Sequence, residues 1–142
     1  MKSELFQKLM LSYLNIPYIF GGKNPLVGED CSGLVCEFLK AIGKLKTNDE
    51  FSSQQLYNMF KPMATDSQPT NTGSLIFFGG GPTDVSHVAM FLDNNFIIEA
   101  GHGTAQTTTR EVAAETGAYV RVRPYTYRAD MVEILNIDLG LT

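Results

Sequence analysis

Cysteine and histidine are scarce in this sequence of 142 residues, which has two of each. Two cysteines do not make the disulfide framework that holds small secreted domains together. Cys31 and Cys36 are five positions apart on a predicted helix, which puts their Cα atoms roughly 8 Å apart, too far for a disulfide bond. We therefore expect two free thiols. The cysteine and histidine spacing matches no common zinc site, so we expect neither a metal nor a cofactor.

Long hydrophobic runs are also missing. Glu4, Gln7 and Lys8 interrupt the N-terminal stretch, which therefore lacks the apolar core of a secretory signal. No later stretch reaches the roughly 20 apolar residues of a membrane-spanning helix. As written, the sequence predicts a protein that is made in the cytoplasm without a signal peptide and is not embedded in a membrane.

Positive charge is the third shortage. The formal net charge is −4 and the pI is about 5.1, which argues against nucleic-acid binding because that needs a basic surface. Residues 119–128 hold three arginines. They form either a local basic patch or a polar edge strand, and we favour the edge strand. The length and the hydrophobic content of 44% predict one folded domain over residues 1–142.

Helices are predicted in the first half of the chain and strands in the second. The helical periodicity covers 3–15, 31–42 and a segment from 53 to Pro62. Strand patterns occur at 74–78, 87–92, 96–100, 118–124 and 131–137. The glycine- and proline-rich segment 17–30 is expected to be irregular, and 79–82 to be a turn. This order predicts an α+β fold rather than alternating strands and helices.

Cys31 has the sequence context of a nucleophile. Asp30 is a suitable N-cap for the predicted helix 31–42, which makes Cys31 its first residue. A helix N-terminus favours the thiolate form of cysteine, and its free N–H groups can hold an oxyanion. The small residues that follow, beginning with Ser32, leave room for a substrate. Cys36 lacks this context and is interpreted as a packing residue.

A thiol nucleophile needs a base, and His87 at the start of a predicted strand can supply one; a solvent-facing histidine is the alternative. The third group depends on the hairpin loop. With a three-residue loop at 93–95, Glu99 shares a face with His87. With a loop of only 94–95, His102 opposes His87 and Glu99 points away. The glycines on either side of His102 disfavour a strand there, so we prefer Glu99.

Four segments together resemble the NlpC-type cysteine peptidases, a family of bacterial cell-wall peptidases with a papain-like fold. They are "PYIFGG" (17–22), "DCSGLV" (30–35), "GSLIFF" (73–78) and "SHVAMFLDNNFIIEA" (86–100). They occur in the family's order and at about its spacing, and the resemblance covers residues 1–124. It implies a papain-like α+β fold in which N-terminal helices pack on an antiparallel sheet.

The resemblance also implies roles for individual residues. Cys31 would be the nucleophile and His87 the general base and acid. The family's third polar group lies twelve residues after the base and is most often histidine, whereas this sequence has Glu99 there. The residues implied to line the site or hold the substrate are Tyr18, Asp30 and Ser32, and His102 is a further candidate that could share the third role.

The activity implied by the resemblance is hydrolysis of amide bonds in the stem peptides of peptidoglycan, commonly γ-D-glutamyl-diamino acid bonds. A related thiol acyltransferase or amidase acting on a different substrate is one alternative, and a non-enzymatic phage tail or assembly module is another. Without a signal peptide, the enzyme would reach the wall through a phage or a secretion machine, or would act on muropeptides in the cytoplasm. The oligomeric state stays open.

Overall fold

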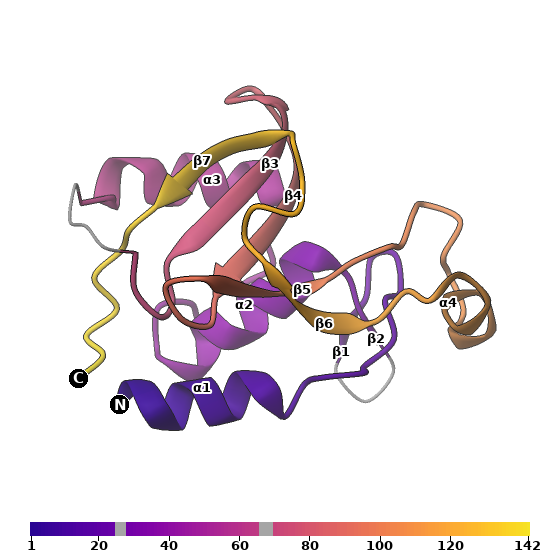
Figure 1. Cartoon of the computed structure of the whole chain (residues 1–142), viewed down its shortest axis with the longest axis horizontal. Coiled ribbons are helices and arrows are strands. Elements are labelled where there is room, and N and C mark those ends of the chain that lie inside the picture. The colour runs from indigo at the N-terminus through magenta and orange to yellow at the C-terminus, as the bar shows by residue number, and fades with distance from the viewer. Residues whose placement is uncertain (25–27, 66–69) are drawn as a thin grey trace.

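The computed structural model describes residues 1–24, 28–65 and 70–142 (Figure 1). The helices are α1 (Ser3–Leu11), α2 (Cys31–Ala41), α3 (Ser53–Phe60) and α4 (Arg110–Thr116), and a 3₁₀ turn η1 (Lys61–Met63) follows α3. The strands are β1 (Lys23–Asn24), β2 (Gly28–Glu29), β3 (Leu75–Gly81), β4 (Asp84–Phe91), β5 (Phe96–Ala100), β6 (Val120–Pro124) and β7 (Met131–Leu135). Strands β3 to β7 form one antiparallel sheet in the order β6-β5-β4-β3-β7. The predicted α+β class is confirmed.

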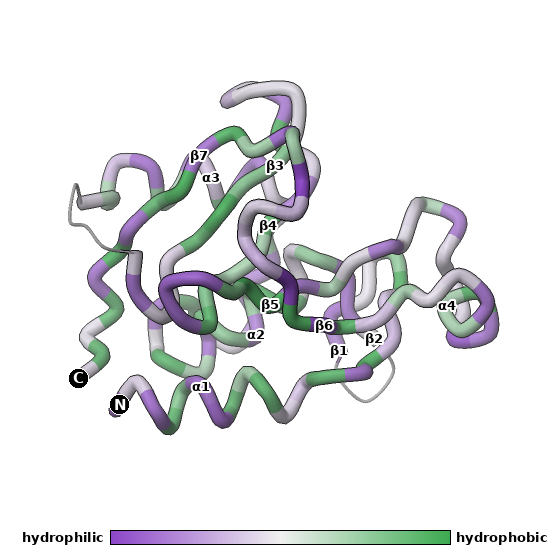
Figure 2. Tube along the Cα trace, in the orientation of Figure 1, coloured by the Kyte–Doolittle hydropathy of each residue, from purple (hydrophilic) through white to green (hydrophobic). Residues whose placement is uncertain are grey.

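Strand β3 lies at the centre of the hydrophobic core. Leu75 and Phe77 pack in the main core, whereas Ile76 and Phe78 pack on the opposite face of the sheet. Figure 2 shows the strand as hydrophobic along most of its length. The apolar residues run consecutively because both faces of this strand are covered. Helices α2 and α3 cover one face, and tyrosines from the loop between β6 and β7 cover part of the other.

Side-chain caps fix where α2 and α3 begin. Asp30 Oδ1 accepts a hydrogen bond from the backbone N–H of Gly33 at 2.6 Å. Ser52 and Gln55 form a capping box, with reciprocal hydrogen bonds of 3.2 and 2.8 Å. Both helices point their N-termini toward the same place, since the side chain of Cys31 contacts that of Ser53.

The β4–β5 hairpin has a three-residue loop, as predicted. Met90 pairs with Ile98, and the backbone N–H of Leu92 donates to the carbonyl of Phe96 at 2.8 Å. This register places residues 93–95 in the loop. It also sets Glu99 on the same face as His87, which a two-residue loop would have prevented.

The predicted turn at 79–82 is wrong for residues 79–81, because β3 continues to Gly81, and the turn lies at 82–83. The strand persists through two shifts in its pairing with β4, where Phe78 pairs with His87 and Gly79 pairs with Val85. One extra residue of β4 is thereby bulged, directly before His87. Gly79 has a φ of +150°, and a Cβ there would lie 2.2 Å from the Asp84 carbonyl oxygen. The glycines at 79–81 therefore continue the strand, with irregular pairing to β4.

Other boundaries also differ from the sequence prediction. The first helix ends at Leu11 rather than at residue 15. Helix α4 was not predicted; the side chain of Thr109 caps it, and Gly117 ends it with a φ of +68°. The segment expected to be irregular contains the short β1–β2 pair, and its residues 25–27 lie outside the described residues.

Strand β6 lies at the edge of the sheet, next to β5. The interpretation of residues 119–128 as a polar edge strand is thus confirmed for its strand portion. Among the described residues, no helix has the length and apolar character that a bilayer crossing requires.

Candidate active site

Cys31 is the first residue of α2 and is nearly enclosed. Its Sγ lies 3.5 Å from the hydroxyl of Ser53 at the start of α3, and its side chain also contacts the imidazole of His87. Burial alone would raise the pKa of the thiol. The hydrogen bond and charge of His87, with help from Ser53, outweigh that effect and hold the pKa of Cys31 below its usual value.

His87 lies in β4 directly after the bulged residue. Its Nε2 is 2.7 Å from Glu99 Oε1, which leaves Nδ1 as the ring nitrogen for the thiol. Burial disfavours the imidazolium, but the contacts with Cys31 and Glu99 raise the pKa of His87 to about 9. The two opposite shifts favour a thiolate–imidazolium pair at neutral pH.

Glu99 is fully buried in β5. Burial would raise the pKa of its carboxyl group, yet His87 and the hydroxyl of Tyr127 together hold that pKa below its usual value. Gly101 leaves the space that the carboxylate occupies, since a Cβ there would lie 2.7 Å from Glu99 Oε2. Glu99 is therefore an ionised partner for the imidazole, although water does not reach it.

Two cavities meet at the thiol, and both are bordered by Tyr18, Cys31 and Ser86. The larger has a volume of about 480 Å³ and extends over the start of α3. The smaller, of about 230 Å³, extends past His87. Tyr18 packs against Gly103 so closely that a Cβ at position 103 would overlap its ring at 1.8 Å. The thiol thus lies between two open regions, as a group that attacks the middle of an extended chain requires.

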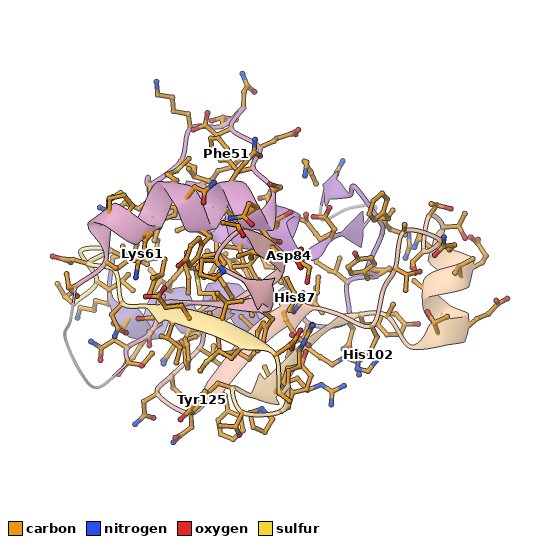
Figure 3. All side chains as sticks on the ribbon, turned by 90° about the horizontal axis from the view of Figure 1, so that it is seen from above. Phe51, Lys61, Asp84, His87, His102 and Tyr125 are labelled. Atoms are coloured by element: carbon orange, nitrogen blue, oxygen red, sulfur yellow. The ribbon has the colours of Figure 1, made fainter. Side chains whose placement is uncertain are left out.

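The other predicted residues lie at different parts of this site. Asp30 and Ser32 line the larger cavity, where the Ser32 hydroxyl donates to Asp30 Oδ1 at 3.3 Å. His102 lines the smaller cavity, displaced from His87 toward α4 (Figure 3). Its Nε2 accepts a hydrogen bond from Arg123, and burial together with the nearby arginines lowers the pKa of His102. The described contacts thus bring Glu99, and not His102, to the imidazole of His87.

Sequence reasoning missed two side chains of this site. In the sequence, Ser53 is recognisable only as part of a helix start, because its approach to Cys31 depends on how α2 and α3 pack. Tyr127 follows the last predicted strand of the resembling region, and its hydroxyl lies 2.6 Å from both carboxylate oxygens of Glu99. No local pattern signals this contact, because it crosses 28 residues and depends on the loop between β6 and β7.

The arrangement can perform nucleophilic chemistry. It combines a thiol of lowered pKa, a histidine in contact with it, and a buried carboxylate that orients the histidine. Within the described part of the chain, no group of three or more histidine, cysteine or acidic residues is placed to hold a metal ion.

A family model described as "NlpC/P60 family" matches residues 15–123. The chain is 32% identical over 127 residues to the peptidoglycan endopeptidase RipA of Mycolicibacterium smegmatis. That match covers 80% of this chain and 21% of RipA, so the chain spans about a fifth of this relative's length.

Solved structures agree with the sequence matches. The P60 domain of an antigen from M. avium subspecies paratuberculosis has a TM-score of 0.64 and 27% identity, over 96% of this chain and 94% of that domain. RipD of Mycobacterium tuberculosis, described as a non-catalytic NlpC/p60 domain protein adapted to peptidoglycan binding, has a TM-score of 0.62 and 22% identity. The match covers 94% of this chain and 95% of the solved RipD chain, and at that identity it shows the shared fold alone.

The matched region is the part of the chain that carries the thiol and its partners. Cys31, His87 and Glu99 all lie within residues 15–123, whereas Tyr127 lies beyond them. The family model covers most of the chain, and solved members share its papain-like α+β fold. The chain therefore belongs to the NlpC/P60 family.

Proposed function

We propose that this chain is a cysteine peptidase that hydrolyses amide bonds in the stem peptides of peptidoglycan. The observation that carries the proposal is the connected series Cys31–His87–Glu99 at the junction of two cavities. The name of the relative RipA, a peptidoglycan endopeptidase, supports the choice of substrate. A chain that only bound peptidoglycan would have no need of a thiol with a lowered pKa beside a histidine with a raised one.

The reaction follows from the positions of these groups. The Cys31 thiolate attacks the amide carbonyl carbon, and the backbone N–H groups at the start of α2 stabilise the oxyanion that forms. The imidazolium of His87 gives its proton to the leaving amine, the C–N bond breaks, and a thioester remains on Cys31. His87 then takes a proton from water, which attacks the thioester and releases the carboxylic acid.

The two cavities suggest how a substrate lies across the thiol. Because His87 protonates the leaving amine, the amine side belongs in the smaller cavity that His87 borders. The acyl side then lies in the larger cavity, beside Asp30 and Ser32. We propose a γ-D-glutamyl-diamino acid bond as the one cleaved, on the strength of the family resemblance.

Digestion of purified peptidoglycan, followed by mass spectrometry of the fragments, tests activity and bond choice together. We expect new peptide termini at one amide bond of the stem peptide. Transfer of the acyl group to an added amine, without hydrolysis, would favour an acyltransferase. Neither products nor labelling of the thiol by iodoacetamide near neutral pH would contradict the enzyme proposal.

The third position can be tested by comparing Glu99→Gln with His102→Ala. Glutamine keeps the shape of the side chain but not the charge that stabilises imidazolium, so we expect kcat to fall roughly 10²- to 10⁴-fold. His102 contacts Arg123 rather than His87, so His102→Ala should affect KM more than kcat. Equal losses of kcat in the two variants would show that His102 shares the role of Glu99.

A further inference from the structure

We propose that Tyr127 is a positioning residue that fixes the rotation of the Glu99 carboxylate and keeps it charged, so that Oε1 faces His87. This inference rests on the proposed function, in which Glu99 acts on His87. It extends the connected series by one member, from a loop outside the region that the family model matches.

Tyr127 completes the hydrogen bonding of the Glu99 carboxylate. The hydroxyl of Tyr127 lies 2.6 Å from both Oε1 and Oε2, so it donates between the two oxygens. His87 contacts Oε1 alone. Among the described residues, Tyr127 is the hydrogen-bond partner that reaches Oε2. Without it, one oxygen of a fully buried carboxylate would lose its donor, which is an unfavourable state for a charged group.

The ring of Tyr127 is held on two sides. Phe78 packs edge-on against it, with ring centroids 6.3 Å apart. The guanidinium of Arg123 lies 5.2 Å from the ring centroid, a cation–π distance. Neither contact uses the hydroxyl group. The ring position, and with it the hydroxyl position, is therefore set by packing rather than by Glu99.

A charged side chain, Arg128, lies beside Tyr127 and is itself held in place. Arg128 interacts with the Tyr127 hydroxyl and also with the Glu99 charge. Its own guanidinium is held by Asp130 in a two-point ion pair, with Nε–Oδ1 at 2.8 Å and Nη2–Oδ2 at 2.7 Å. Asp130 thus holds the positive charge of Arg128 beside the Tyr127 hydroxyl. This charge favours a hydroxyl that donates to Glu99 rather than one that accepts from it.

Tyr127→Phe removes the hydroxyl and keeps both ring contacts. With one donor lost, the pKa of Glu99 rises, so Glu99 takes up a proton at a less acidic pH. The imidazolium of His87 then loses its partner charge, and the thiolate of Cys31 is lost at that higher pH too. We expect the acid limb of thiolate reactivity to move upward by about one pH unit.

Other charged groups also face this series, and the experiment must hold them constant. They are Cys31, His87, His102, Arg121, Arg123, Arg128 and Asp130. Tyr127→Phe leaves all of these side chains in the protein. Tyr125→Phe is the matched control, because Tyr125 lies in the same loop and its ring packs on Phe91, 5.5 Å between centroids, away from Glu99.

The measurement is the rate of Cys31 alkylation by iodoacetamide as a function of pH, in a Cys36→Ala background that leaves one thiol. We expect the upward shift in Tyr127→Phe and no shift in Tyr125→Phe. In a Glu99→Gln background, Tyr127→Phe should add nothing, because its effect passes through the carboxylate. Far-UV circular dichroism and thermal unfolding confirm that each variant is folded.

The outcomes separate this inference from the proposed function. A shift in alkylation without any peptidoglycan cleavage would support the role of Tyr127 and contradict the peptidase proposal. Cleavage with an unshifted profile in Tyr127→Phe would overturn the role of Tyr127 alone. An equal shift with and without Glu99 would also overturn it, and a thiol inert across the whole pH range would contradict both proposals.

Discussion

Cys31→Ala and His87→Ala should each abolish hydrolysis, with a fall in kcat of about 10⁴-fold or more. Alanine at position 31 removes the atom that bonds to the carbonyl carbon, and no other described side chain offers a thiol at the junction of the cavities. Alanine at position 87 removes both the proton donor for the leaving amine and the charge that lowers the pKa of the thiol. The measurement is kcat on a soluble stem-peptide fragment.

Cys36→Ala is the matched control for Cys31→Ala. Cys36 lies in the same helix and is also buried, but its Sγ contacts the carbonyl of Phe51 at 3.7 Å, and burial raises the pKa of this thiol. It packs in the main core rather than against His87. We expect activity close to that of the unchanged protein. Residual hydrolysis in Cys31→Ala that disappears in the Cys31→Ala/Cys36→Ala double variant would contradict this assignment.

The position of Cys31 at the start of a capped helix can be predicted from the sequence, because the signals for it are local. Asp30 as cap, Cys31 as the first helical residue and the helix that follows are adjacent in the chain. Glu99 is distant from Cys31 in the sequence. Whether its side chain faces His87 depends only on whether the hairpin loop has two or three residues. The glycines on either side of His102 favour the three-residue loop, and His102 indeed lies beyond the end of β5, with a φ of +63°.

Other parts of the site could not be predicted, because they depend on packing between distant elements. The hydroxyls of Ser53 and Tyr127 reach the site from a second helix and from the β6–β7 loop. The glycines at 79–81 look like a turn in the sequence, but pairing with β4 extends the strand through them, and the backbone N–H of Gly79 also donates to the carbonyl of Asp130 at 3.0 Å. Hydrogen bonds to a neighbouring strand thus override the weak preference of a glycine-rich segment for a turn.

Glu29, next to Asp30, is the clearest case of a residue whose state depends on the fold. Its side chain is fully buried, and neither carboxyl oxygen has a hydrogen-bond partner among the described residues. It lies against Gly33 of α2, where a Cβ would come within 3.0 Å of Oε2. Burial, followed by the like charges of Glu37 and Asp30, raises the pKa of Glu29 to about 8, while Lys23 and Lys40 oppose this.

This raised pKa makes the stability of the protein depend on pH. In the unfolded chain Glu29 loses its proton near its ordinary pKa of 4.5, whereas in the folded protein it keeps the proton until about pH 8. Its contribution to stability is therefore fully present below pH 4.5 and is lost as the pH rises toward 8. The loss amounts to about 1.4 kcal/mol for each pH unit in that window.

Glu29→Gln replaces the protonated carboxyl with a neutral group of similar shape that cannot ionise. We expect it to lie within about 1 kcal/mol of the unchanged protein at pH 5 and to be more stable by roughly 3 to 5 kcal/mol at pH 8. Urea unfolding at several pH values measures the difference. Glu115→Gln, at an exposed position of α4, is the control and should give a small difference that does not change with pH.

The pH trend distinguishes this explanation from a simple packing effect. If glutamine only packed better or worse than glutamate at this position, the difference in stability would be the same at pH 5 and pH 8. Glu37→Gln adds a second check, because removing this like charge should lower the pKa of Glu29 and reduce the loss of stability near pH 8. A Glu29→Gln gain that stays constant across the range would refute a buried, protonated Glu29 beneath the start of α2.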